Sequence, residues 1–102
     1  MRTARISITA QVQLRELLAQ GAKYYEPIFL ETKRLLFYAA VRSLLDFPAR
    51  RATNRELGLR LYRVQSTPFL IAYDFDEVEL RIHTVFHHHA DRRLENLRAI
   101  EW

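Results

Sequence analysis

The chain has 102 residues, of which 49% are hydrophobic, with two glycines, three prolines and no cysteine. This length suits one small domain, spanning residues 1–102, and the hydrophobic content argues against disorder. The lack of cysteine excludes disulfides and thiolate metal sites, and no apolar run approaches the roughly 20 residues of a membrane helix. No signal-peptide pattern opens the chain, so we expect a cytoplasmic protein with no membrane partner.

Charge is distributed unevenly along the chain. The net charge is +4, and arginine dominates, because Lys23 and Lys33 are the only lysines among sixteen basic residues. Residues 49–73 carry five basic side chains and one acidic side chain, whereas residues 74–102 carry four basic and seven acidic ones. Arginine binds phosphate or carboxylate through a planar fork, so nucleic acid and an acidic protein are equally plausible partners. The predicted target-binding or nucleic-acid-binding residues are Arg55, Arg60, Arg63 and Arg92.

The first twenty residues predict a strand followed by a helix. Residues 3–8 alternate weakly between polar and apolar side chains, which is typical of a strand. Thr9 can cap the helix that follows. Residues 10–20 place leucines on one helical face, and Gly21 can end the helix.

A second, longer helix is predicted after Pro27, which fits the first turn of a helix because its missing N–H has no partner there. The helix should run to about Phe47, and Pro48 should stop it. Residues 35–41 are apolar almost all round. A helix this apolar is normally covered on both sides, so we expect the first helix on one side and the sheet on the other.

Three further strands are predicted in the second half of the chain, at residues 59–64, 69–73 and 78–87. Between the last two, residues 74–77 read Asp-Phe-Asp-Glu, which is suited to a tight turn. The third run alternates for ten residues. One predicted face, directed to the core, holds Val78, Leu80, Ile82, Thr84 and Phe86; the other, open face holds Glu79, Arg81, His83, Val85 and His87.

A short final helix is predicted after Asp91, with apolar residues recurring on one side up to Ile100. The element order is then β-α-α-β-β-β-α. Because the strands follow the helices as a block, the predicted fold class is α+β, with a small, mostly antiparallel sheet packed on a helical hairpin.

Histidine and arginine side chains on the open face offer candidate chemistry. A histidine beside an arginine could act as an acid or base in phosphodiester cleavage, so the candidate catalytic residues of an endoribonuclease are Arg81, His83 and His87. A histidine-rich surface strand end with no catalytic role is the simpler alternative. Adjacent histidines on a strand point alternately, and no Cys/His spacing accompanies them, so no metal site is expected. Two glycines are too few for a phosphate-cradling loop, and no cofactor is expected.

Four segments carry a likeness to a known family: LLDFP at 44–48, RELGLR at 55–60, FLIAY at 69–73 and the stretch from 80 to 91. Together with the element order, they resemble the RelE/ParE superfamily of bacterial toxins from type II toxin–antitoxin systems. The last stretch is similar to a ParE-type ending, Leu-His-Gly-x-x-Asp. His87 and Asp91 match this ending, whereas His88 stands where glycine is usual.

The resemblance implies a toxin that arrests growth and is neutralised by a cognate antitoxin protein. ParE-like members act on DNA gyrase, and RelE-like members cut messenger RNA on the ribosome. We favour a ParE-like protein that binds and inhibits gyrase without catalysis, because the lysine-rich face of RelE-like enzymes is absent and residues 74–79 are acidic. A ribosome-dependent mRNA endoribonuclease is the alternative, and an inactive relative that only binds an antitoxin is a third possibility.

Overall fold

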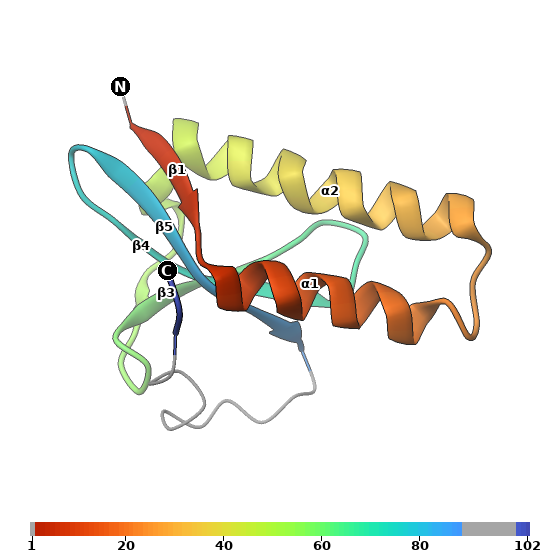
Figure 1. Cartoon of the computed structure of the whole chain (residues 1–102). Helices are drawn as coiled ribbons and strands as arrows, with labels where there is room; N and C mark the ends of the chain where they lie inside the picture. Colours follow the sequence, from red (N-terminus) through yellow and green to blue (C-terminus); the bar gives the residue numbers. More distant parts are fainter. Residues whose placement is uncertain (1, 89–99) are drawn as a thin grey trace.

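The computed structural model describes residues 2–88 and 100–102, and it consists of one twisted sheet with two long helices packed against it (Figure 1). The elements, in chain order, are β1 (Thr3–Ile6), α1 (Ile8–Gly21), α2 (Pro27–Asp46), a short 3-10 helix (Pro48–Arg50), β2 (Thr53–Asn54), β3 (Leu59–Arg63), β4 (Phe69–Phe75) and β5 (Glu79–His87). The predicted α+β class is confirmed. The predicted final helix, which Asp91 would cap, lies almost wholly outside the described residues.

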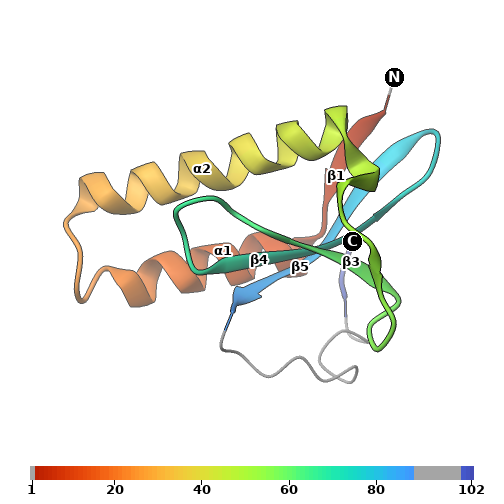
Figure 2. The same cartoon turned by 180° about the vertical axis from the view of Figure 1, so that it is seen from behind.

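The sheet has the strand order β1-β5-β4-β3-β2. Strand β1 pairs with β5 in parallel, and every other pair is antiparallel. The first and last strands along the chain are therefore neighbours (Figure 2). The two-residue strand β2 was not predicted. It forms a hairpin with β3, in which the Asn54 side chain accepts the N–H groups of Glu56 and Leu57, and Gly58 has a φ of 68°.

Helix α1 begins two residues earlier in the chain than expected, because Ser7 is its N-cap. The Ser7 hydroxyl accepts the Ala10 N–H at 2.9 Å and donates to the His83 carbonyl at 2.7 Å. This side chain therefore both caps the helix and fixes it to β5. The prediction that Thr9 is the cap was wrong, since Thr9 already lies within the helix.

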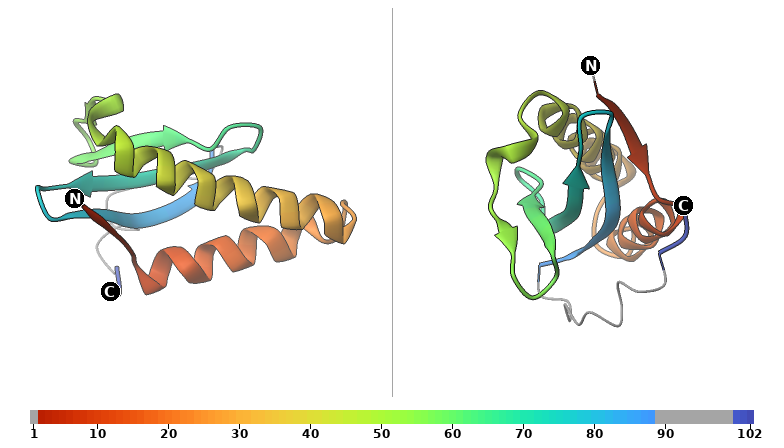
Figure 3. Two further views of the ribbon diagram at one scale, coloured as in Figure 1. Left: turned by 90° about the horizontal axis from the view of Figure 1, so that it is seen from above. Right: turned by 90° about the vertical axis from the view of Figure 1, so that its left-hand side faces the viewer.

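Helices α1 and α2 lie side by side in a hairpin, and both pack on the sheet (Figure 3). Helix α2 contacts α1 and the sheet, as expected, but the expectation that these two neighbours cover it on both sides was wrong. One face of α2 is buried, but its outer face exposes large apolar side chains, among them Ile28, Phe29, Leu35 and Tyr38. Among the described helices, none is both long enough and apolar enough to cross a membrane.

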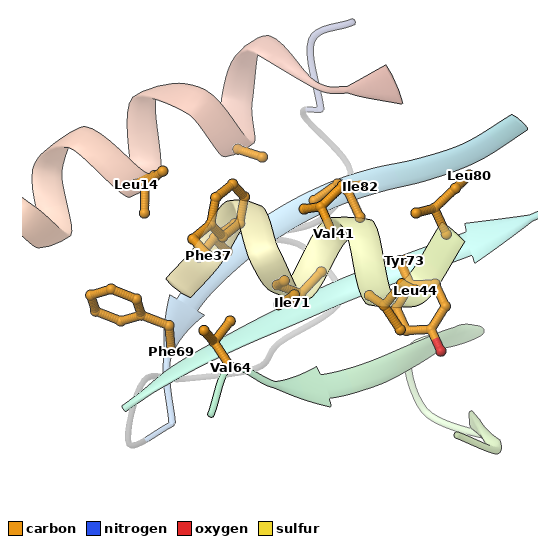
Figure 4. Packing of buried hydrophobic residues seen from close by; sticks show 13 residues of the cluster. Leu14, Phe37, Val41, Leu44, Val64, Phe69, Ile71, Tyr73, Leu80 and Ile82 are labelled. Atoms are coloured by element: carbon orange, nitrogen blue, oxygen red, sulfur yellow. The ribbon is translucent and has the colours of Figure 1, made fainter. Parts of the chain in front are cut away.

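The hydrophobic core lies between the helices and the sheet (Figure 4). Helix α2 contributes Phe37, Val41 and Leu44, and the central strands contribute Ile71, Tyr73, Leu80, Ile82 and Val85. Each of these large side chains stabilises the fold by about 1.5–3 kcal/mol when it is fully buried. Tyr73 is fully buried as well, and its hydroxyl donates to the Pro48 carbonyl at 2.7 Å.

A β-bulge at His83 divides β5 into two parts, and the side chains before and after it alternate between the two faces of the sheet in different phase. Tyr73 pairs with Ile82, but the next residue back on β4, Ala72, pairs with Thr84, so His83 is an extra residue on β5. Beyond the bulge the side-chain alternation shifts by one position. Val85 is consequently buried in the core. The prediction of unbroken alternation was therefore wrong at the end of β5.

Phe86 and His87 follow from the same shift. Phe86 was expected in the core, but it pairs with Leu70 on the face away from the helices and is half-buried. His87 pairs with Phe69, which belongs to the core. His87 is thus on the helix side of the sheet, not on the face that carries Arg81.

Candidate functional site

The outer face of the sheet, which is the face that the two helices leave uncovered, carries a cluster of charged side chains centred on Asp74. The register places Asp74 of β4 opposite Arg81 of β5, and Arg5 of β1 on the far side of Arg81. The Asp74 carboxylate accepts the Arg81 Nε–H at 2.8 Å and lies 2.9 Å from His83 Nε2. The bulge makes the second contact possible because it turns His83 toward the same face.

Three carboxylates share the Arg81 guanidinium. It donates to Asp74 through Nε and Nη2, to Asp76 through Nη1 at 2.8 Å, and to Glu79 at 3.4 Å. The hydrogen bonds that it donates to Asp74 and Asp76 raise the pKa of Arg81 above its ordinary value. This arginine is therefore held in a local ion-pair network, and its guanidinium nitrogens already donate hydrogen bonds to carboxylates of the same chain.

The same network lowers the pKa values of two of these carboxyl groups. Hydrogen bonds from Arg81 and from the backbone N–H groups of Glu79 and Val78 lower the pKa of Asp76 to about 2. Burial acts to raise the pKa of Asp74, but hydrogen bonds from Arg81 and His83 outweigh it, so that pKa is also lowered. Both groups are ionised at neutral pH, and this part of the outer face is acidic.

Trp102 packs against His83 on this face. The two rings meet edge to face with centroids 4.8 Å apart, and the Arg5 guanidinium lies 5.2 Å from the indole centroid. The backbone of Glu101 holds this segment in place, since its carbonyl accepts the Ile8 N–H at 2.8 Å and its N–H donates to the Thr9 hydroxyl. The candidate acid–base group His83 therefore lies between a carboxylate and an indole ring.

His87 is separated from this cluster. It lies at the opposite end of β5, where it lines a cavity of about 220 Å³ together with Tyr24 and Tyr25 of the α1–α2 connection and Lys33 of α2. The three candidate catalytic residues thus fall into two places. Arg81 and His83 meet at Asp74, and His87 lies near the helical hairpin.

The predicted binding arginines also fall on different surfaces. Arg60 is on the helix side of the sheet, where it stacks 5.1 Å from the Phe75 ring centroid and donates to the Arg51 carbonyl. Arg63 pairs with Leu70 on the outer face. Arg55 is exposed in the β2–β3 hairpin. Arg92 lies outside the described residues.

A second arginine cluster surrounds Tyr62. The guanidinium groups of Arg50 and Arg51 each lie 5.6 Å from its ring centroid. Cation–π contacts of this kind hold the charges at the surface without neutralising them. Arg50, Arg51 and Arg60 therefore form one positive region near the end of α2, which holds three of the five arginines of residues 49–73.

No group of three His, Asp or Glu side chains in the described part of the chain could hold a metal ion. The side chains that sequence reasoning missed are Arg5, Asp74 and Trp102. Asp74 had been assigned only to the turn. Arg5 reaches the cluster because β1 pairs with β5, and no local pattern in the sequence indicates that pairing.

Comparison with known proteins places the fold. No protein-family model matches the chain, and no curated protein matches it. The chain is similar to a chain of a solved structure described as "Chromosomal ParDE TA system from P. aeruginosa", with a TM-score of 0.76 at 13% sequence identity. The match covers 85% of this chain and 96% of that chain. The chain therefore has the fold of a component of a ParDE structure.

Proposed function

We propose that this chain is the toxin of a type II toxin–antitoxin system. The observation that carries the proposal is the similarity in fold to a chain of the ParDE structure, which spans nearly all of that chain. The segments that resemble RelE/ParE toxins support it independently, because they were recognised in the sequence alone. In this role the protein would arrest growth from the cytoplasm until its antitoxin binds it.

The proposed target is DNA gyrase, and the proposed action is binding without catalysis. Two features support this choice over RNA cleavage. The Arg81 guanidinium is paired with three carboxylates, so it is poorly placed to bind a phosphate. The surrounding acidic groups would also repel an RNA backbone. The proposed contacts to the target are the arginines of the basic segment, with exposed Arg55 and Arg63 as the first to test.

The proposed antitoxin is an acidic protein that folds on this chain. A net charge of +4 favours such a partner. The exposed apolar side chains of α2, including Phe29 and Leu35, offer surface for its apolar residues.

An mRNA endoribonuclease remains the second candidate function, and the His83–Asp74 contact is the observation that favours it. A carboxylate that accepts a hydrogen bond from one imidazole nitrogen orients the ring, which is an arrangement used in acid–base catalysis. Arg81→Ala would be a poor test, because it removes the counter-ion of three carboxylates. His83→Ala combined with His87→Ala leaves those ion pairs intact, and Arg34→Ala, at an exposed helix arginine paired with Glu31, is the matched control.

Induced expression in a bacterial host, with separate assays of plasmid supercoiling and transcript integrity, tests the proposal. We expect growth arrest, lost supercoiling and intact transcripts, and we expect the double histidine variant to stay toxic. Rapid transcript cleavage that the double variant abolishes would instead establish the ribonuclease. Full growth with normal DNA and transcripts would point to an inactive relative.

A further inference from the structure

The cavity beside His87 has a chemical character that the proposed function does not use. Its lining residues come from α1, the α1–α2 connection, α2 and the ends of β4 and β5. The helical hairpin extends beyond this end of β5 (Figures 1 and 3). Its lining is largely apolar and aromatic, with Leu17, Leu18, Leu30 and Phe69 together with Tyr24 and Tyr25. A volume of about 220 Å³ is enough for a flat ring but not for a folded peptide segment.

The cavity adjoins a second, wider hollow of about 720 Å³, which shares Tyr25, Lys33, Pro68 and His87 with it and is called its mouth. This mouth is basic. Lys33 of α2, Arg63 of β3 and the adjacent His87 and His88 line it, together with the Ser66 and Thr67 hydroxyl groups. The described lining residues include no aspartate or glutamate. Cations from two sides of the fold therefore converge on one opening, which favours an anion.

Two ring contacts show how these groups are arranged. The Lys33 ammonium lies 3.8 Å from the Tyr25 ring centroid, and the His87 and His88 rings stack with centroids 4.8 Å apart. Tyr25, Lys33 and His87 line both the cavity and its basic mouth. An aromatic ring placed in the cavity would thus lie next to the cations.

We propose that this cavity binds a nucleotide, with the base among the tyrosines and leucines and the phosphate between Lys33 and Arg63. An aromatic base stacks well on tyrosine and histidine rings, and a phosphate accepts charge-assisted hydrogen bonds from lysine and arginine. A doubly charged phosphate matches the two cations, Lys33 and Arg63, better than a single carboxylate does. This site lies at the end of the sheet beside the helical hairpin, away from the Asp74 cluster. It shares Arg63 with the proposed target contacts but not Lys33, so Lys33→Ala separates a failure of this site from a failure of the proposed function.

Titration of the purified chain with adenosine 5′-monophosphate, followed by calorimetry and by backbone amide NMR, tests the site. Adenosine and inorganic phosphate are titrated in parallel, and a short single-stranded RNA distinguishes a free nucleotide from a nucleic-acid source. We expect the monophosphate to bind more tightly than either of its parts, with shifts at the amides of Gly21, Tyr25, Ser66 and Thr67. Tighter binding of the RNA than of the monophosphate would identify nucleic acid as the source.

Matched variants show whether the cations act as proposed. Lys33→Ala and Arg63→Ala should each weaken monophosphate binding by about tenfold or more, the loss of one charged hydrogen bond. Arg34→Ala removes a neighbouring charge that does not line the cavity and should leave affinity unchanged. An unchanged thermal midpoint confirms that each variant is folded. The proposal is overturned if no nucleotide binds at millimolar concentration, if phosphate alone binds equally well, or if Arg34→Ala weakens binding as much as Lys33→Ala.

Discussion

The buried hydroxyl of Tyr73 allows a direct test of one hydrogen bond that joins the core to the segment before Arg50 and Arg51. Its ring is fully buried, and its hydroxyl donates to the Pro48 carbonyl at 2.7 Å, just before Arg50 and Arg51. Burial raises the pKa of this phenol, against the smaller opposing effect of nearby arginines. At neutral pH the hydroxyl is therefore protonated and can donate this hydrogen bond.

Tyr73→Phe removes this donor while keeping the ring, so it creates almost no cavity. The cost is the lost hydrogen bond plus a buried carbonyl without its partner, about 1–3 kcal/mol. For a domain of this size, each kcal/mol lowers the thermal midpoint by about 4–8 °C. Urea and thermal unfolding followed by circular dichroism would measure both quantities.

Tyr62→Phe is the matched control for Tyr73→Phe. The Tyr62 hydroxyl lies 3.4 Å from Arg50 at a half-exposed position, so its removal should change stability by less than about 0.5 kcal/mol. Equal stability of Tyr73→Phe, Tyr62→Phe and the unmodified chain would refute the reasoning.

Three further predictions concern stability. Leu44→Ala, at a fully buried position, should cost about 2–5 kcal/mol in urea unfolding, and a cost below that of Leu35→Ala on the exposed face of α2 would contradict the core assignment. Gly58→Ala places a side chain at a φ of 68° and should destabilise by about 1 kcal/mol, whereas a stabilising effect would exclude this turn. Folding lowers the pKa of Asp76 from 3.8 to about 2. Its contribution to the free energy of unfolding is therefore complete above the pKa of the unfolded chain and is lost as the pH falls through the pKa of the folded chain. Asp76→Asn should therefore flatten the loss of stability in this acid range, and an unchanged acid profile would argue against the Arg81 network.

Much of the fold could be predicted from local patterns. The α2 boundaries follow from Pro27 and Pro48, and the β4–β5 hairpin follows from the two aspartates between apolar runs. The α1 start was assigned wrongly to Thr9, because the true cap, Ser7, is selected by its hydrogen bond to β5, which the local sequence does not show.

The candidate site was harder to predict because it depends on register. A single extra residue at His83 moves Val85 into the core and His87 to the helix side. An alternating sequence pattern does not predict where a bulge occurs. The pairing of β1 with β5 joins residues more than seventy positions apart. Local reasoning identified Arg81 and His83, but it could not identify the carboxylates that hold Arg81 or the contact between His83 and Trp102.

The most direct test of the central claim is a supercoiling assay with purified gyrase, relaxed plasmid, ATP and the purified chain. We expect inhibition that rises with the concentration of the chain, that persists in the His83→Ala, His87→Ala double variant, and that weakens in Arg55→Ala or Arg63→Ala. Undiminished supercoiling at a large excess of folded chain, together with cleavage of ribosome-bound messenger RNA by the same preparation, would contradict the account and make the endoribonuclease the function.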